Sequence, residues 1–405
     1  QPSFIFALAA ILNSRILMKK TCASAAVSLA CLAMNSAFAA NGYSFSAYDS
    51  ASASYINKEI HLSAEDYLAQ YPDGIKNAAT GLKLTGSDRT KKENRIYKVS
   101  FSLLDAEKFS ITHASDAGVR LVMGQARLGG ENTSDIRIDA QKYGVHLSRL
   151  STLDANADNI SISAANSSGF SQAIRVLESG SSSAPLNQDG ELSGVNLTAN
   201  ESIILSSKAS AYGSTALNAS LSGGFANLKA RSIALSAEHT SDKGVNAIGI
   251  DAASGNAVNL TADAISISTN AQKRAYGIRN YSNSLAGATV RLGDQDTDSI
   301  AIESRSKGTA SGILSMTDPS SKQTHGGSVE LTARSIHISA VGSKADKANS
   351  LAAAGIEAWD QHHVSVGDEQ SAVSISASAD DSTVAGIAAV LGGEVVVNGA
   401  SLDIE

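Results

Sequence analysis

Ile, Leu and Val alternate with small polar residues in short runs along most of the chain. The clearest runs join two apolar-x-apolar pairs through a short polar gap, and the second pair is usually followed by Ser. Three such copies begin at Val195, Val258 and Val329, and a fourth, which begins at Phe225, matches with a small slip. Alternation with a period of two is typical of a half-buried strand. The density of Ser, Thr and Gly disfavours helix in the same windows.

The second apolar pair recurs along the chain at a mean interval of about 33 residues. Its first residues are Phe109, Ile136, Ile160, Ile203, Ile233, Ile265, Ile300, Ile336, Val373 and Leu402. A third apolar element follows most pairs and reads Ala-x-Gly-Ile or a close relative, as at residues 275–278. The spacing between elements varies while the elements keep their length, so the variation falls in loops.

Three short strands per copy predict an all-β fold, a parallel β-helix (β-solenoid) of about ten coils. Ile, Leu and Val would point into the bore, while Ser, Thr, Asn and Asp would face water or form stacked ladders. Successive coils would pair in parallel about 4.8 Å apart. Because a single coil cannot bury its own inward face, stability must come from the interfaces between neighbours, and the ends of the rod need caps.

Composition agrees with this prediction. Only four of the 405 residues are proline, which cannot donate a hydrogen bond to a β-ladder. Charged residues make up 18%, and the net charge is −7 without any long basic run. An acidic chain of this kind is a poor partner for nucleic acid or anionic lipid.

The N-terminal region predicts export. Residues 18–39 have the order of a secretory signal peptide: Lys19 and Lys20, an apolar run, and the small residues Ala37 and Ala39, with cleavage before Ala40. A membrane anchor is the alternative interpretation of this run. Residues 1–17 are interpreted as translated sequence upstream of the start, or as an extension of the leader.

Both cysteines, Cys22 and Cys31, lie inside the predicted signal peptide. The mature protein would therefore contain no disulfide, although exported proteins commonly use them. Packing alone would have to stabilise it.

Residues 40–100 are predicted to form an N-terminal cap region, with an unrelated small domain as the alternative. Ser63 starts a capping-box-like pattern for one short helix through Gln70, and residues 91–95 form a charged loop. The β-helix then occupies residues 101–405. A fresh coil begins at its C-terminal end, so we expect the natural protein to continue beyond Glu405.

These features together resemble the passenger region of bacterial autotransporters (type V secretion), including the pertactin-like adhesins. The resemblance covers about residues 100–405 and includes the Gly-Asp turns after Leu292 and Val366. It implies a right-handed β-helix, exported through the periplasm to the cell surface or the extracellular space. It also implies a C-terminal outer-membrane β-barrel, which is absent from this chain, and a non-enzymatic adhesion or scaffold role.

Two other functions stay open. One is an extracellular β-helix enzyme that degrades polysaccharide, with Glu303 and Arg305, or Glu357 and Asp360, as acidic and basic groups on an outer face. The other is a β-solenoid exported by a separate outer-membrane pore, although the Asn-Pro-Asn-Gly type of export motif is missing. A serine protease would need a Gly-Asp-Ser-Gly run, which the sequence lacks.

Two motifs suggest metal binding only weakly. His362 and His363 are adjacent, but an ordinary loop explains them as simply. Asp294, Asp296 and Asp298 form an acidic loop that could attract calcium, without the glycine and distal glutamate of an EF-hand. We therefore predict no catalytic, cofactor-binding or metal residues, and the sequence leaves the surface ligand undefined.

Overall fold

The computed structural model describes residues 42–87, 96–177, 193–221, 224–242, 246–253, 255–282, 286–317, 325–345, 351–380 and 382–405. The predicted signal peptide with Ala37, Ala39 and Ala40, the leader at residues 1–17 and the charged loop at residues 91–95 lie outside the described residues.

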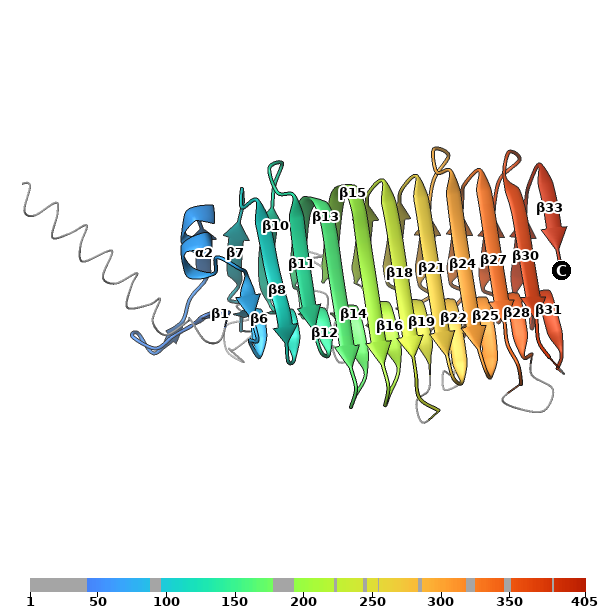
Figure 1. Cartoon of the computed structure of the whole chain (residues 1–405), viewed down its shortest axis with the longest axis horizontal. Coiled ribbons are helices and arrows are strands. Elements are labelled where there is room, and N and C mark those ends of the chain that lie inside the picture. Colours follow the sequence, from blue (N-terminus) through green and yellow to red (C-terminus); the bar gives the residue numbers. More distant parts are fainter. Residues whose placement is uncertain are drawn as a thin grey trace, which may run out of the picture.

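Strands from successive coils pair in parallel and form the three walls of a rod (Figure 1). The walls are numbered after the three strands of each coil in chain order. The third wall is an 11-stranded sheet. Its strands, in spatial order, are β1 (Tyr43–Ser46), β6 (Thr80–Thr85), β9 (Ala117–Val122), β12 (Tyr143–Ser148), β14 (Ser171–Leu177), β16 (Ser214–Leu221), β19 (Ala247–Ala253), β22 (Arg274–Ser282), β25 (Thr309–Thr317), β28 (Ala353–Trp359) and β31 (Val384–Val390).

The first and second walls belong to one 20-stranded sheet, because β13 (Thr152–Asn166) and β15 (Gly194–Ala209) each run through the corner between them. The first wall also contains β4 (Lys58–Leu62), β7 (Val99–Leu103), β10 (Gly124–Gly129), β17 (Phe225–Lys229), β20 (Ala257–Thr261), β23 (Thr289–Leu292), β26 (Ser328–Leu331), β29 (His363–Val366) and β32 (Glu394–Val397). The second wall also contains β5 (Ile75–Lys76), β8 (Lys108–Ala114), β11 (Asp135–Ala140), β18 (Ser232–His239), β21 (Ala264–Ala271), β24 (Ser299–Ser306), β27 (Ser335–Val341), β30 (Ala372–Ser378) and β33 (Ser401–Ile404).

The ten repeat positions that the sequence predicts form one continuous column in the second wall, from Phe109 to Leu402. Ile265, for example, pairs with Ile233 on one side and Ile300 on the other. This confirms the parallel β-helix and its three strands per coil. The slip expected at Phe225 is not present, because Ala226 takes the place in the register that Val195 and Val258 occupy in the neighbouring coils.

The alternating pattern sends apolar side chains into the bore and polar ones outward, as predicted. The inward residues form one core cluster that extends from Tyr43 to Ile375. On the outer face of the first wall, Asn196, Asn227 and Asn259 form a ladder in which each amide nitrogen donates to the side-chain oxygen one coil earlier. The side-chain oxygen of Asp154 accepts the first of these bonds, at 2.8 Å.

The N-terminal helix α2 (Ala64–Gln70) confirms the predicted short helix. Ser63 is its N-cap, and its hydroxyl accepts a hydrogen bond from the backbone N–H of Asp66 at 3.0 Å. Tyr67 is buried, and its hydroxyl accepts from the N–H of Ser110 in β8. Strands β1, β4, β5 and β6 from the same region pair with the two sheets, and β2 (Tyr48–Asp49) and β3 (Ser54–Tyr55) form a small antiparallel pair. The domain boundary near residue 100 stays a prediction.

Glycine in the third wall lets that wall approach the second one closely. A Cβ atom at Gly277 would lie 2.3 Å from Cγ2 of Ile302 and 2.6 Å from the carbonyl oxygen of Gly312. Real atoms do not approach so closely, so the site excludes even alanine in this geometry. The same approach to an isoleucine Cγ2 occurs in seven other coils. The pairs are Gly81–Ile111, Gly118–Ile138, Gly144–Ile162, Gly249–Ile267, Gly312–Ile338, Gly355–Ile375 and Gly386–Ile404.

Two coils depart from this rule together at both positions. The glycine is replaced by Ala173 and Ala216, and the residues that follow at the isoleucine position are Leu205 and Leu235. Leucine branches at Cγ and has no methyl group at the Cγ2 position, so the space beside the third wall is larger. The third-wall glycine and the second-wall isoleucine thus determine together the width of the bore.

We predict that Gly277→Ala lowers the free energy of unfolding by about 2 kcal/mol, because the added methyl group overpacks the bore. Adding Ile302→Leu should recover part of this loss, so the double variant is more stable than the sum of the single changes predicts. Thermal unfolding followed by circular dichroism measures the effect. Gly213→Ala is the control, since its Cβ would meet only an ordinary 3.4 Å contact. Strictly additive effects would refute the coupling.

Candidate functional site

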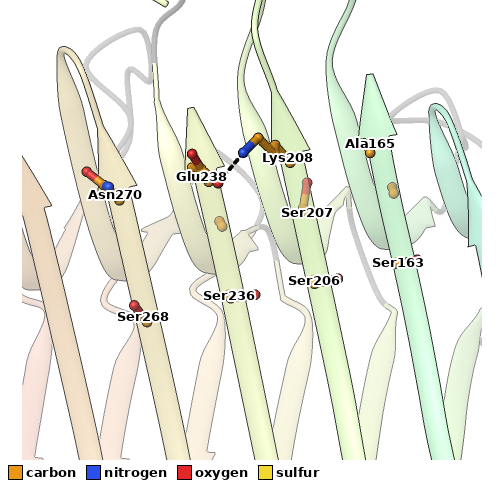
Figure 2. A pocket seen from close by; sticks show the side chains of 11 residues that line it. Ser163, Ala165, Ser206, Ser207, Lys208, Ser236, Glu238, Ser268 and Asn270 are labelled. Atoms are coloured by element: carbon orange, nitrogen blue, oxygen red, sulfur yellow. Dashed lines mark ion pairs between the residues drawn. The ribbon is translucent and has the colours of Figure 1, made fainter. Parts of the chain in front are cut away.

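A shallow groove of about 380 Å³ crosses the outer face of the second wall (Figure 2). Its floor is a ladder of serines, in which Ser163, Ser206, Ser236 and Ser268 lie at the same register on neighbouring strands. The ammonium of Lys208 and the carboxylate of Glu238 form an ion pair of 2.8 Å at its edge. Apart from this half-exposed pair, the polar side chains that line the groove are serine hydroxyls and the amide of Asn270, so it has few means of selecting a ligand.

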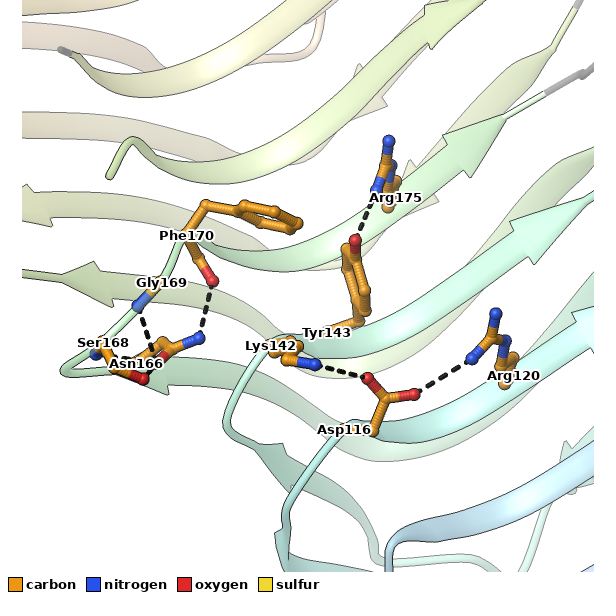
Figure 3. A network of polar contacts seen from close by, with 9 residues as sticks. All are labelled: Asp116, Arg120, Lys142, Tyr143, Asn166, Ser168, Gly169, Phe170 and Arg175. Atoms are coloured by element: carbon orange, nitrogen blue, oxygen red, sulfur yellow. Dashed lines mark hydrogen bonds and ion pairs between the residues drawn. The ribbon is translucent and has the colours of Figure 1, made fainter. Parts of the chain in front are cut away.

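The outer face of the third wall carries a larger group of interacting side chains, which we call the cationic cluster (Figure 3). It consists of Asp116, Arg120, Lys142, Tyr143, His146, Phe170, Gln172 and Arg175. Figure 3 shows Arg120 and Lys142 converging on the carboxylate of Asp116, at 3.0 and 3.3 Å. Tyr143 extends toward Arg175, whose guanidinium donates to the phenol oxygen.

Three rings in tilted contact form the centre of the cationic cluster. The rings of Tyr143 and His146 have centroids 4.5 Å apart, and the ring of Phe170 lies 5.6 Å from that of Tyr143. The guanidinium carbon of Arg175 lies 5.2 Å from the Tyr143 centroid, at cation–π distance. Burial, with the nearby Arg175 and Arg120, lowers the pKa of His146 to about 4. The imidazole is therefore neutral at pH 7.

A second cluster lies further along the same face, on β19, β22, β25 and β28. Its apolar members are Ile248, Tyr276, Tyr281, Leu314, Met316 and Trp359. Within it, the guanidinium of Arg279 forms a two-pronged ion pair with Asp251, with 2.8 Å from Nε to Oδ1 and 2.6 Å from Nη2 to Oδ2. Asp251 and Arg279 are largely buried, so the pair compensates two charges that would be costly alone.

Glu357, which the sequence analysis named with Asp360 for a polysaccharide-degrading enzyme, lies at the edge of this second cluster. Its carboxylate accepts hydrogen bonds from the Ser311 hydroxyl at 2.7 Å and from the Trp359 indole at 3.4 Å. Burial raises its pKa in spite of these bonds. Asp360 lies in the following turn, with a positive φ of 54°. The other proposed pair, Glu303 and Arg305, is a half-exposed ion pair on β24 at 3.7 Å.

The acidic loop at Asp294, Asp296 and Asp298 is a turn between the first and second walls. Gly293 has a φ of +74°, and the Asp294 carboxylate accepts hydrogen bonds from the backbone of Asp296 and the hydroxyl of Thr297. The carboxylate of Asp298 instead forms an ion pair with Arg334 at 2.6 Å. The turn after Val366 is built in the same way around Gly367 and Asp368. The Asp294 carboxylate therefore closes its turn, whereas that of Asp298 pairs with the neighbouring coil.

His362 and His363 point to opposite sides of the first wall. His362 is fully buried, with Nδ1 2.7 Å from the hydroxyl of Ser315 and Nε2 2.9 Å from that of Ser282. His363 lies on the outer face, 3.2 Å from Glu394. The structure therefore does not bring this pair together. Across the described ranges, no three His, Cys, Asp or Glu side chains are grouped so as to hold a metal ion.

Sequence reasoning missed the cationic cluster, although a signal for it was present. Arg120, His146 and Arg175 each follow the inward apolar residue of the third element, so they form one column once the coils are aligned. In the sequence, that element stands out by its apolar residues, and the residue after them varies from coil to coil. The column turns three separate polar residues into neighbours.

Comparison with protein families, curated proteins and solved structures finds no match for this chain. Within the part of the chain that the structure describes, no helix combines the length and apolar character needed to cross a membrane. The register of the strands alone therefore establishes the fold, a parallel β-helix with two long parallel sheets.

We predict that the protein loses stability as the pH falls from about 6.5 to about 4. Burial lowers the pKa of His362 to about 4, whereas an unfolded histidine binds a proton near pH 6.5. Between these values the unfolded chain takes up a proton that the folded chain refuses, so unfolding becomes easier. His146 acts in the same direction.

Melting temperatures measured between pH 4 and pH 8 test this prediction. His362→Asn should flatten the decline, while the matched variant His363→Asn, on the outer face, should keep the wild-type slope. An unchanged slope in His362→Asn would show that this histidine does not carry the effect.

Proposed function

We propose that the chain is the passenger region of an exported autotransporter-type protein, displayed on or released from the cell surface, with a non-enzymatic adhesion or scaffold role. The observation that carries this proposal is the unbroken parallel stacking of coils, each of which needs only its neighbour for burial. The predicted signal peptide and the absence of cysteine after residue 31 support it from the sequence.

The stacking suits export in an unfolded state. A chain that emerges from a pore can add one coil at a time, and each coil buries its Ile, Leu and Val residues on the coil before it. No long-range disulfide has to be closed. The finished rod presents three elongated outer faces, and a rod of this shape suits display of a binding surface away from a membrane.

Protease treatment of intact cells of the source organism tests the proposal. An antiserum against residues 225–404 should lose its signal while a periplasmic marker survives, or the protein should be found in the medium. Deletion of residues 18–39 should retain the protein inside the cell. Protection in intact cells, with cleavage only after the outer membrane is broken, would contradict surface display.

Two further readouts separate the parts of the proposal. A gene sequence that continues into an outer-membrane barrel beyond Glu405 would support autotransport over export by a separate pore. A deletion strain that adheres to surfaces as well as its parent would contradict the adhesive role without affecting the export claim.

The buried carboxyl of Glu357, whose pKa burial raises, favours one second candidate, a polysaccharide-degrading enzyme, because the general acid of such an enzyme is a carboxyl with a raised pKa. A panel of acidic and neutral glycans would reveal such an activity. It should be lost in Glu357→Gln and kept in Glu303→Ala, and activity retained in Glu357→Gln would reject this site.

A further inference from the structure

Five buried polar atoms without hydrogen-bond partners lie together on the outer face of β12, β14 and β16. They are both ring nitrogens of His146, Nε of Arg175 and the side-chain oxygens of Gln172 and Asn218. The described residues contain ten such atoms, so half of them fall on this one patch. Buried polar groups in proteins nearly always have partners, and a local concentration of unmet ones indicates that a partner is missing.

The register makes these residues neighbours. His146 pairs with Arg175, and Arg175 pairs with Asn218, so the three form a column with spacings of about 4.8 Å. Gln172 lies beside this column and pairs with Tyr143. His146 is only 9% exposed, whereas Gln172 and Arg175 are half-buried and reachable from solvent. Asn218 is 6% exposed, and the unmet atoms of all four residues are themselves buried. A ligand therefore reaches them only when the half-buried side chains of Gln172 and Arg175 turn outward.

The patch is positively charged in a chain whose net charge is −7. Arg120 and Lys142 share the single carboxylate of Asp116. Among the described residues, no carboxylate lies within ion-pair distance of Arg175, whose guanidinium is bonded to the Tyr143 hydroxyl and rests near two aromatic rings. A guanidinium held in this way is well suited to bind a carboxylate.

Aromatic surface completes the patch. The Phe170 ring is 39% exposed and lies 5.9 Å from the Arg175 guanidinium. Its position is set by the Asn166 side chain, which accepts from the N–H groups of Ser168 and Gly169 and donates to the carbonyl of Phe170 (Figure 3). A ring fixed in this way offers a flat apolar face to a ligand.

We propose that the outer face of β12, β14 and β16 binds an acidic saccharide, with Arg175 on its carboxylate. The unmet oxygens of Gln172 and Asn218 are acceptors, so the ligand must also carry donors, and sugar hydroxyls supply them. The ring of Phe170 packs against the apolar face of the pyranose. The inference gives the adhesive surface proposed above a ligand class and rests on that proposal for its biological setting.

Other ligands meet only part of this pattern. A simple anion satisfies Arg175 but leaves the two acceptor oxygens unpaired. A neutral sugar satisfies those oxygens but leaves the guanidinium of Arg175 without a negative charge beside it.

Calorimetric titration of the purified chain with an oligogalacturonate tests the proposal. The fully methyl-esterified oligosaccharide, which keeps the hydroxyls and lacks the charge, and acetate, which keeps only the charge, are the comparison ligands. We expect binding of the oligogalacturonate alone. Arg175→Ala should weaken it at least tenfold, and Gln172→Leu, which keeps the charge, should weaken it about fivefold. Arg305→Ala is the matched control on the second wall and should bind like wild type.

Nuclear magnetic resonance of the wild-type chain provides a test that needs no variant, so it does not depend on whether a variant folds. The ring nitrogen resonances of His146 should move on titration of the wild-type chain, because at least one nitrogen gains a partner, while those of His362 stay fixed. Unchanged affinity in Arg175→Ala, equal binding of the ester or of acetate, or the absence of binding would each overturn the proposal. Because binding is measured in solution, these results leave the surface-display claim untouched.

Discussion

The in-register stacking of inward apolar side chains is the constraint on which the rest of this protein depends. Ile265 lies between Ile233 and Ile300, and the same holds along the whole second wall. Shifting one strand by a single residue would turn its apolar residues outward, so the register is strongly specified. The close approach of glycine to isoleucine adds a second requirement, since it determines how near the third wall can come.

The repeat itself could be read from the sequence because strands impose a period of two on neighbouring residues. The column from Phe109 to Leu402 and the helix after Ser63 both follow from such local patterns. The pairing of Gly277 with Ile302 could not be foreseen, because it joins two walls across the bore. The column of Arg120, His146 and Arg175 needed the exact register, which variable loop lengths conceal.

The stacking also explains why polar residues gather into clusters. A residue at one register position has neighbours about 4.8 Å away in the adjacent coils, so side chains that are some 30 residues apart in sequence become adjacent. On the first wall this produces an asparagine ladder that satisfies itself. On the third wall it produces the cationic cluster, in which several buried polar atoms have no hydrogen-bond partner. The proposed saccharide-binding role rests on this difference between a ladder whose hydrogen bonds are complete and a cluster whose hydrogen bonds are not.

Disulfide cross-linking between coils tests the register most directly. Cysteines at positions 234 and 266, which pair across β18 and β21, would have Cα atoms about 4.8 Å apart, within the range that a disulfide spans. Cysteines at positions 234 and 268 would be offset by two residues and too distant. With Cys22 and Cys31 changed to Ser, mild oxidation should link the folded Ala234→Cys/Ser266→Cys chain and leave Ala234→Cys/Ser268→Cys unlinked. Efficient linking of the offset pair, or failure of the in-register pair, would contradict the parallel β-helix described above.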